Sequence, residues 1–137
     1  MGINVAYIPP SSGAVALGFA IPAPRVVDAV RQLLATGHVR HAYLGIVPVA
    51  VTDAIAAGLN VGVDHGVVAY QVPAGTPAAR GGLRSGDVIV RFDGREIASV
   101  EDLFAALRRK NPGDEVSVTF VRDGQQTTRT VRLGDIP

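Results

Sequence analysis

The period of the hydrophobic pattern changes several times along the 137 residues. Residues 2–22 hold two apolar runs, INVAYI and AVALGFAIP, around the turn-forming stretch PPSSG (Pro9–Gly13), which predicts a β-hairpin. Helical spacing follows at 24–36. Pro24 suits the first turn of this helix, and Gly37 suits a left-handed stop. The first part of the chain is therefore predicted to be a hairpin followed by one helix.

The remaining residues read as short strands interleaved with short helices. Strands are predicted at 44–51, at Gly66–Val72, at Asp87–Ile97 with a turn at Asp93–Gly94, and in a hairpin at 115–133 about Asp123–Gly124. Period-2 alternation in the last hairpin predicts inward-facing side chains at Val116, Val118 and Phe120, and at Val131 and Leu133.

Three further helices are predicted from their capping residues. Thr52 caps one that stops at Gly58, and Thr76 with Pro77 starts another of one or two turns. The strongest helix signal is SVEDLFAALRRKNPG, where Ser99 is the cap and Pro112–Gly113 the stop. Its charges match the helix dipole, with Glu101 and Asp102 at the start and Arg108, Arg109 and Lys110 at the end.

Composition narrows the classes of protein that fit this pattern. Hydrophobic residues make up 47% of the chain and aromatic residues 5%, with no Trp, which predicts an aliphatic core. A net charge of +1 without a basic run argues against nucleic acid as a partner. The absence of Cys excludes disulfides and thiolate metal sites. No apolar run reaches the ~20 residues of a membrane span.

The sequence offers no pattern for chemistry. His38 and His41 are three residues apart but read as exposed linker residues rather than metal ligands. No Ser lies in a Gly-x-Ser-x-Gly elbow, and there is no phosphate-binding or dinucleotide-binding glycine motif. We therefore predict no catalytic residue, no metal and no cofactor.

The stretch YLGIVPV (Tyr43–Val49) is unusual for a core strand. Gly45 weakens a strand, and Pro48 removes a ladder donor, which confines it to an edge strand or a bulge. An edge strand that opens with a glycine turn is free to pair with another chain. This pattern suggests a site that binds peptide ends.

YLGI (Tyr43–Ile46) and HGVVAYQVPAGTPAARGGLRSGDVIVRFDGREI (His65–Ile97) carry a family resemblance. In particular, GTPAARGGLRSGDVI resembles the SPAAxAGLxxGDVI hallmark of the PDZ domain in bacterial HtrA/DegP-type serine proteases. GINVAYIPPSSGAVALGFAIP resembles the last hairpin of their trypsin-like domain, and PRVVDAVRQLLATGHV resembles the linking helix. The resemblance implies a C-terminal fragment, with residues 1–37 from the protease domain and linking helix and 38–137 as the PDZ domain. The family's catalytic His, Asp and Ser would lie upstream.

The implied fold is α+β: a small, partly open β-barrel or sandwich of five to six strands with two or three helices, preceded by the hairpin and linking helix. The implied site takes a peptide carboxylate on the loop Tyr43–Ile46, where successive N–H groups can form an anion-binding nest. Arg40 or His41 would add positive charge there, or are merely solvated. The peptide would continue as a strand beside Val47, Pro48 and Val49.

The facing wall would be the helix Ser99–Lys110. Helical spacing puts Val100, Phe104 and Leu107 on one stripe with Leu103 beside it. We expect Leu103 in the core, and Phe104 and Leu107 to form with Ile46 an apolar pocket for the last side chain, unless they too are simply core. Such a pocket favours hydrophobic C-termini because it penalises an unpaired charge.

Pro48 departs from the family's usual pattern. The equivalent residue donates to and accepts from the third-last residue of the peptide, whereas Pro48 can only accept, so ordinary peptides should bind weakly. The expected partners are C-terminal or unfolded segments with hydrophobic ends and the parent protease domain, in a periplasmic or other extracytoplasmic location that the family implies. The alternative is an oligomerisation module whose groove is filled by a neighbouring domain. The strands of 2–22, without the rest of a barrel, either stay disordered or pair with another chain, which leaves a homo-oligomer open.

Overall fold

The structure, a computed structural model, describes residues 2–8 and 17–136. The chain divides into two compact units, Met1–Val39 and Arg40–Pro137. We describe each unit by itself. The predicted domain boundary between residues 37 and 38 stays a prediction.

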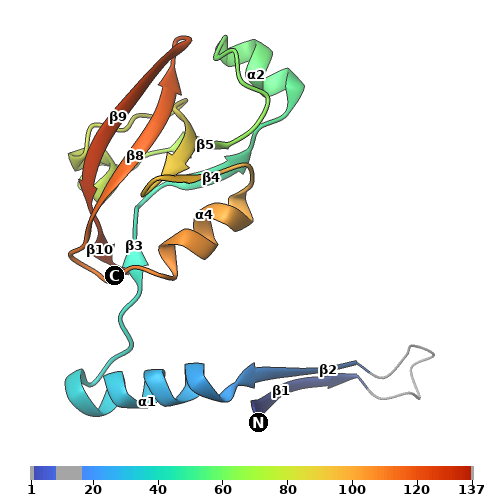
Figure 1. The fold of residues 1–137 in the computed structure, drawn as a ribbon, viewed down its shortest axis with the longest axis vertical. Helices are drawn as coiled ribbons and strands as arrows, with labels where there is room; N and C mark the ends of the chain where they lie inside the picture. Colours follow the sequence, from blue (N-terminus) through green and yellow to red (C-terminus); the bar gives the residue numbers. More distant parts are fainter. Residues whose placement is uncertain (1, 9–16, 137) are drawn as a thin grey trace. The chain divides into compact units, whose positions relative to one another are not determined.

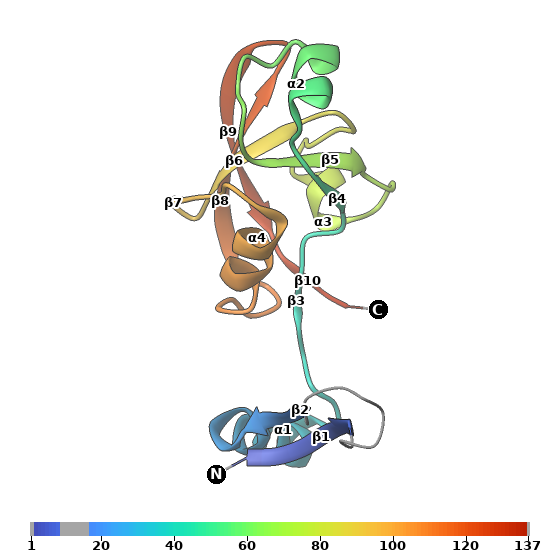
Figure 2. The ribbon, with the colours of Figure 1, turned by 90° about the vertical axis from the view of Figure 1, so that its right-hand side faces the viewer.

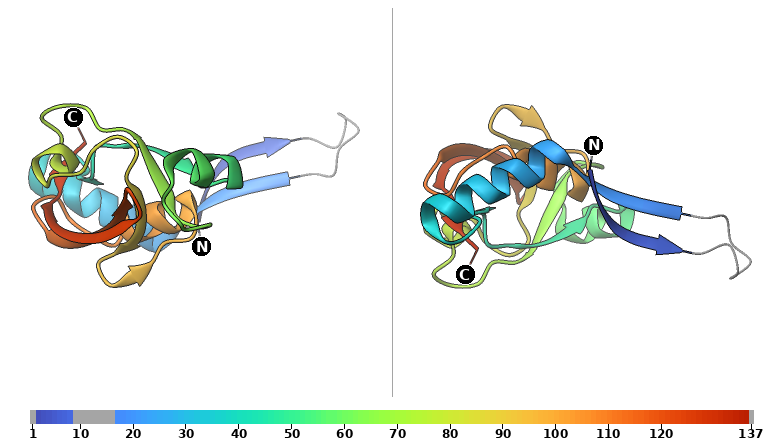
Figure 3. Two further views of the ribbon diagram at one scale, coloured as in Figure 1. Left: turned by 90° about the horizontal axis from the view of Figure 1, so that it is seen from above. Right: turned by 90° about the horizontal axis from the view of Figure 1, so that it is seen from below.

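The first unit contains the predicted hairpin and helix. Strands β1 (Gly2–Ile8) and β2 (Leu17–Pro22) pair antiparallel and lie side by side (Figure 3). Helix α1 (Ala23–Thr36) follows directly and ends at Gly37, whose φ is 78°. The predicted turn PPSSG (Pro9–Gly13) lies outside the described residues.

Helix α1 has an apolar side that no described residue of the chain buries. Val27, Val30 and Leu33 are each close to half exposed, and Leu34 is 83% exposed. No helix in the described ranges is long and apolar enough to cross a membrane.

The second unit is built around an open, antiparallel sheet (Figure 1). Its strand order is β4–β5–β6–β8–β9, with β7 paired to β6. These strands are β4 (Val47–Ala50), β5 (Val67–Gln71), β6 (Val88–Phe92), β7 (Arg95–Glu96), β8 (Glu115–Arg122) and β9 (Gln125–Arg132). A separate two-stranded sheet joins β3 (Ala42–Tyr43) to β10 (Gly134–Asp135). Within the described residues the large sheet does not close into a barrel, which leaves β4 and β9 as its edges.

Three short helices accompany this sheet. They are α2 (Asp53–Leu59), α3 (Pro77–Arg80) and α4 (Val100–Leu107), and each begins after its predicted cap: Thr52, Thr76 or Ser99. Figure 2 shows α2 at one end of the unit, away from α4. The expected α+β class is confirmed by this arrangement.

Two apolar clusters form the core of the unit. The larger contains Leu44, Leu103, Phe92 and Phe120, together with Val116, Val118, Val131 and Leu133. The predicted inward-facing residues of the last hairpin are therefore confirmed as buried. The smaller cluster includes Val61, Val68, Val88 and Val121, against which α2 packs through Ile55 and Leu59.

Two predicted helix ends are wrong. Helix α2 continues through Gly58 and ends at Leu59, and its C-cap Asn60 adopts a left-handed φ of 50° and donates its N–H to the carbonyl oxygen of Ala57 (3.3 Å). A short polar Asn side chain tolerates this conformation, so a glycine was not needed there. Helix α4 ends at Leu107, before the predicted basic end, and Lys110 instead forms an ion pair with Asp93 of the β6–β7 turn.

Candidate functional site

The loop Leu44–Ile46 lies between β3 and β4 and has unused hydrogen-bond donors. Leu44 is 2% exposed and anchors the loop in the core. In the described part of the chain, no protein group accepts a hydrogen bond from the N–H of Leu44, Gly45 or Ile46. Because backbone donors in buried places are nearly always paired, three consecutive unused ones indicate a place for an external acceptor.

Gly45 is required at this position for two separate reasons. Its φ is +83°, a left-handed conformation that residues with a Cβ rarely adopt. A Cβ added there would also lie only 2.4 Å from the Cβ of Thr76. The backbone of the loop therefore approaches the side chain of Thr76 as closely as a glycine allows.

Helix α3 holds the loop from behind. The N–H of Ala78, in the first turn of α3, donates to the carbonyl oxygen of Leu44 at 2.8 Å. Thr76 Oγ1 accepts from the N–H of Ala79 (3.3 Å) and donates to the carbonyl of Pro73 (2.8 Å). Sequence reasoning assigned Thr76 and Pro77 only to the helix start and missed this support. The packing joins residues that are more than 30 positions apart in the sequence.

Strand β4 begins directly after the loop and is an edge strand. Its register to β5 shifts between Val47, opposite Gln71, and Pro48, opposite Ala69. Pro48 thus lies both on an edge and at a bulge, which are the two positions that the sequence allowed. Val47 is 43% exposed beside this free edge, while Pro48 and Val49 are half-buried.

Helix α4 lies next to β4 (Figure 1). Its start is fixed by a capping box, in which the N–H of Asp102 donates to Ser99 Oγ and the N–H of Ser99 donates to Asp102 Oδ2. Leu103 is 1% exposed, as predicted for a core residue, and Phe104 is 46% exposed. Leu107 is buried within the larger cluster, and Val100 packs half-buried against it.

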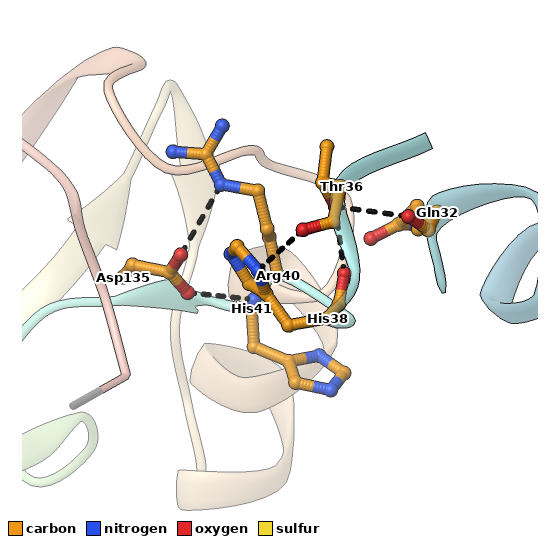
Figure 4. Close-up of polar contacts among 6 residues, drawn as sticks. All are labelled: Gln32, Thr36, His38, Arg40, His41 and Asp135. Atoms are coloured by element: carbon orange, nitrogen blue, oxygen red, sulfur yellow. Dashed lines mark hydrogen bonds and ion pairs between the residues drawn. The ribbon is translucent and has the colours of Figure 1, made fainter. Parts of the chain in front are cut away.

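Of the two candidate cations near the loop, Arg40 has an ion-pair partner and His41 is held through its backbone N–H. Arg40 Nε lies 3.2 Å from Asp135 Oδ2, and the backbone N–H of His41 donates to Asp135 Oδ1 at 3.2 Å (Figure 4). His38 Nδ1 lies 3.1 Å from the carbonyl oxygen of Thr36. Arg40 is thus an ion-pair partner of Asp135. The described residues contain no group of three or more His, Cys, Asp or Glu placed to hold a metal.

A second loop, Gly82–Asp87 of the GGLRSGD motif, carries the buried charge of this unit. Asp87 is 1% exposed and accepts from Arg122 Nε and Nη2, both at 2.7 Å, and from the N–H of Arg84 at 2.7 Å. The guanidinium of Arg122 also lies 5.0 Å from the centre of the Phe120 ring. The hydrogen bonds to Asp87 raise the pKa of Arg122 above its usual value.

Comparison with known proteins shows which protein family the chain resembles. A profile of the PDZ domain family matches residues 42–133. The chain is 34% identical over 137 residues to a probable periplasmic serine endoprotease, DegP-like, of Hahella chejuensis, and covers 29% of that protein. It is 40% identical over 122 residues to the serine protease Do-like HtrA of Lactococcus lactis subsp. cremoris, covering 85% of this chain and 30% of that one.

Solved structures give the same picture. An HtrA-type protease, AlgW, with a decapeptide matches 99% of this chain and 42% of its own, at a TM-score of 0.85 and 34% identity. The same protease with a tripeptide matches 99% of this chain at a TM-score of 0.78. The chain spans less than a third of the length of the two curated relatives. The name of the Hahella relative supports the expected periplasmic or other extracytoplasmic location.

Proposed function

This chain belongs to the PDZ domain family, and from that premise we propose that residues 42–133 bind the C-terminal ends of polypeptides. The observation that carries the proposal is the loop Leu44–Ile46. Its three consecutive N–H groups have no acceptor in the described chain, and its glycine has a left-handed φ. Successive amides in such a turn form a nest for an anion, and a peptide carboxylate is one anion that backbone nests capture.

The rest of the peptide would add to the sheet as a further strand. Strand β4 has a free edge, and Val47, Pro48 and Val49 would face the peptide backbone. Strand addition uses main-chain hydrogen bonds for affinity and side-chain pockets for selectivity. Two similar structures are of an HtrA-type protease with a decapeptide or a tripeptide, which supports this mode.

The pocket for the last side chain would be apolar. Phe104 is exposed on α4, which contacts β4, while Leu107 is buried in the larger cluster and Ile46 and Val100 pack against that cluster. A charged terminal side chain would lose its hydration here without gaining a partner. The preferred ligand is therefore a free C-terminus with a hydrophobic last residue.

In the longer protein, this unit would regulate or position substrate for a trypsin-like serine protease of the cell envelope. The relatives that match over all or most of the chain are named serine proteases, and this chain covers a minor part of each. On this proposal residues 38–137 recognise the peptide, and the hydrolytic residues lie in the protease domain.

A second function is an assembly module whose binding surface is filled by a neighbouring domain. Pro48 favours this alternative because it deprives an added strand of one hydrogen-bond donor at a bulge of β4. It also protects an exposed edge against unwanted pairing.

Fluorescence anisotropy with the full chain tests the first function against the second. The probes are labelled peptides that end in Val with a free carboxylate, each paired with the same peptide as its C-terminal amide. We expect the free acids to bind and the amides to bind at least about tenfold more weakly, since charge-assisted hydrogen bonds are the stronger class. Equal affinity would contradict carboxylate capture. No binding at millimolar peptide would favour the assembly module.

A further inference from the structure

Asp135 connects the two ends of the second unit. Its Oδ2 lies 3.2 Å from Arg40 Nε, and its Oδ1 accepts the backbone N–H of His41 at 3.2 Å (Figure 4). The N–H of Ile136 in turn donates to the carbonyl oxygen of His41 at 3.3 Å. We call this set of contacts, Arg40 and His41 with Asp135 and Ile136, the terminal clamp.

The terminal clamp leads directly into the loop Leu44–Ile46. Strand β3 has only two residues, Ala42 opposite Asp135 and Tyr43 opposite Gly134, and Tyr43 is followed by Leu44. A ladder of two residue pairs supplies few hydrogen bonds, and the contacts of the Asp135 side chain with Arg40 and His41 add to what holds the chain just before the loop.

Strand β10 also lies against the other support of the loop. A Cβ added at Gly134 would lie 3.0 Å from Cγ of Pro77, the first residue of α3, and 3.9 Å from Cδ1 of Tyr43. Helix α3 holds the carbonyl of Leu44 through Ala78. Strand β10 therefore borders both elements that determine where the three amides of the loop point.

We propose that Asp135 is a positioning residue for the amides of Leu44, Gly45 and Ile46, and that the terminal clamp couples their occupancy to the segment Arg40–His41. This inference rests on the proposed function. If the loop holds its binding conformation for only part of the time, its apparent affinity for peptide is reduced by that fraction. Coupling is reciprocal, so a peptide bound at the loop stabilises the clamp by the same factor. Arg40 and His41, the first residues of the second unit, would thus respond to whether a peptide is bound.

The test compares D135A, D135N and R40A with E96A in the full chain. Glu96 is a matched control, because it also belongs to a two-residue strand and forms an exposed ion pair, with Arg91 at 3.3 Å. The probe is the labelled free-acid peptide ending in Val. We expect the Kd to rise about fivefold for D135A and about twofold for R40A, which keeps the His41 contact, and to stay unchanged for E96A.

A second measurement separates positioning from general stability. The amide of Ala78 reports on the loop because it donates to the Leu44 carbonyl, so its hydrogen exchange should accelerate in D135A and slow when peptide binds. D135N serves if D135A does not fold. An unchanged Kd together with unchanged Ala78 exchange in a folded variant would overturn the positioning role alone. If the unsubstituted chain binds no free-acid peptide, the proposed function fails and this role fails with it.

Discussion

Two loops of the second unit treat their polar groups in opposite ways. In the loop Gly82–Asp87, which we call the closed loop, the polar groups are paired within the protein. The buried carboxylate of Asp87 accepts from Arg122 and from the N–H of Arg84. Four further N–H groups of this loop donate to backbone carbonyl oxygens of the protein; they belong to Gly82, Leu83, Gly86 and Asp87. In the loop Leu44–Ile46, which we call the open loop, none of the three N–H groups has an acceptor in the described chain.

The difference separates a structural motif from a candidate site. Both loops contain glycine and lie near α3, and both belong to the segments that carry the family resemblance. Only the closed loop supplies its own anion, the carboxylate of Asp87. The open loop has the donors without the anion. This contrast suggests that the pairing of backbone N–H groups distinguishes a binding loop from a stabilising loop better than glycine content does.

Among changes to the two loops, the largest effect is expected from breaking the closed loop with D87A. Arg122 and the N–H of Arg84 lose their acceptor, and removing one partner of a largely buried pair costs about 3 kcal/mol, reduced somewhat here because Arg122 is partly exposed. Urea unfolding of the variant measures this loss. E96A, which breaks an exposed pair, should cost at most about 0.5 kcal/mol. Equal losses in the two variants would mean that Asp87 does not hold its loop.

Next comes the glycine of the open loop. G45A combines a left-handed φ with a 2.4 Å contact to Thr76, so we expect a loss of about 2 kcal/mol in the free energy of unfolding and at least tenfold weaker peptide binding. G113A is the matched control, because Gly113 has a φ of +93° and no heavy atom within 4 Å of an added Cβ. It should lose about 1 kcal/mol and bind peptide normally. If G45A and G113A behave alike, the close approach has no role.

A smaller effect sharpens the contrast between binding and packing on α4. F104A removes a side chain that is 46% exposed, so stability should change little while the peptide Kd rises about tenfold, or about 1.4 kcal/mol. L103A removes a neighbour that is 1% exposed and should instead destabilise the fold by about 3 kcal/mol. Anisotropy and urea unfolding on both variants measure the two effects. Unchanged peptide affinity in F104A would assign Phe104 to packing alone.

The smallest expected change is a gain. P48A restores an N–H to β4, and one neutral hydrogen bond contributes about 0.5–1.5 kcal/mol, so the affinity for free-acid peptides should rise about two- to tenfold. P112A, which restores an N–H in the turn after α4 and outside the proposed site, serves as the control in the same titration. Should P48A leave the affinity unchanged, the added strand does not use this position.

Local signals predicted the elements of the fold well. Ser99, Thr76 and Thr52 all cap helices, and Asp93–Gly94 and Asp123–Gly124 both form turns with positive φ, because caps and tight turns depend on a few adjacent residues. The stop of α2 at Asn60 was missed because asparagine and glycine compete for the same left-handed position.

The surroundings of the candidate site could be predicted only in part. The sequence placed Gly45 in a turn and Pro48 on an edge or bulge, because both constraints lie in the residues themselves. It could not show that Thr76 packs on Gly45, that Ala78 holds Leu44, or that Arg40 pairs with Asp135, 95 positions away. Such contacts depend on how distant segments fold together. The roles of Tyr43–Ile46, Val47–Val49, Val100, Phe104 and Leu107 in peptide binding remain predictions.

The pairing of β3 with β10 also has a consequence for how this unit can be combined with others. Ala42 and Asp135, which lie near the two ends of the unit Arg40–Pro137, are opposite each other on neighbouring, antiparallel strands. A unit whose two ends meet can be inserted into a surface loop of a host protein, or joined to further copies, without distortion of its own fold. The same arrangement would allow the whole unit, with its proposed recognition surface, to be moved into another protein as one segment of chain.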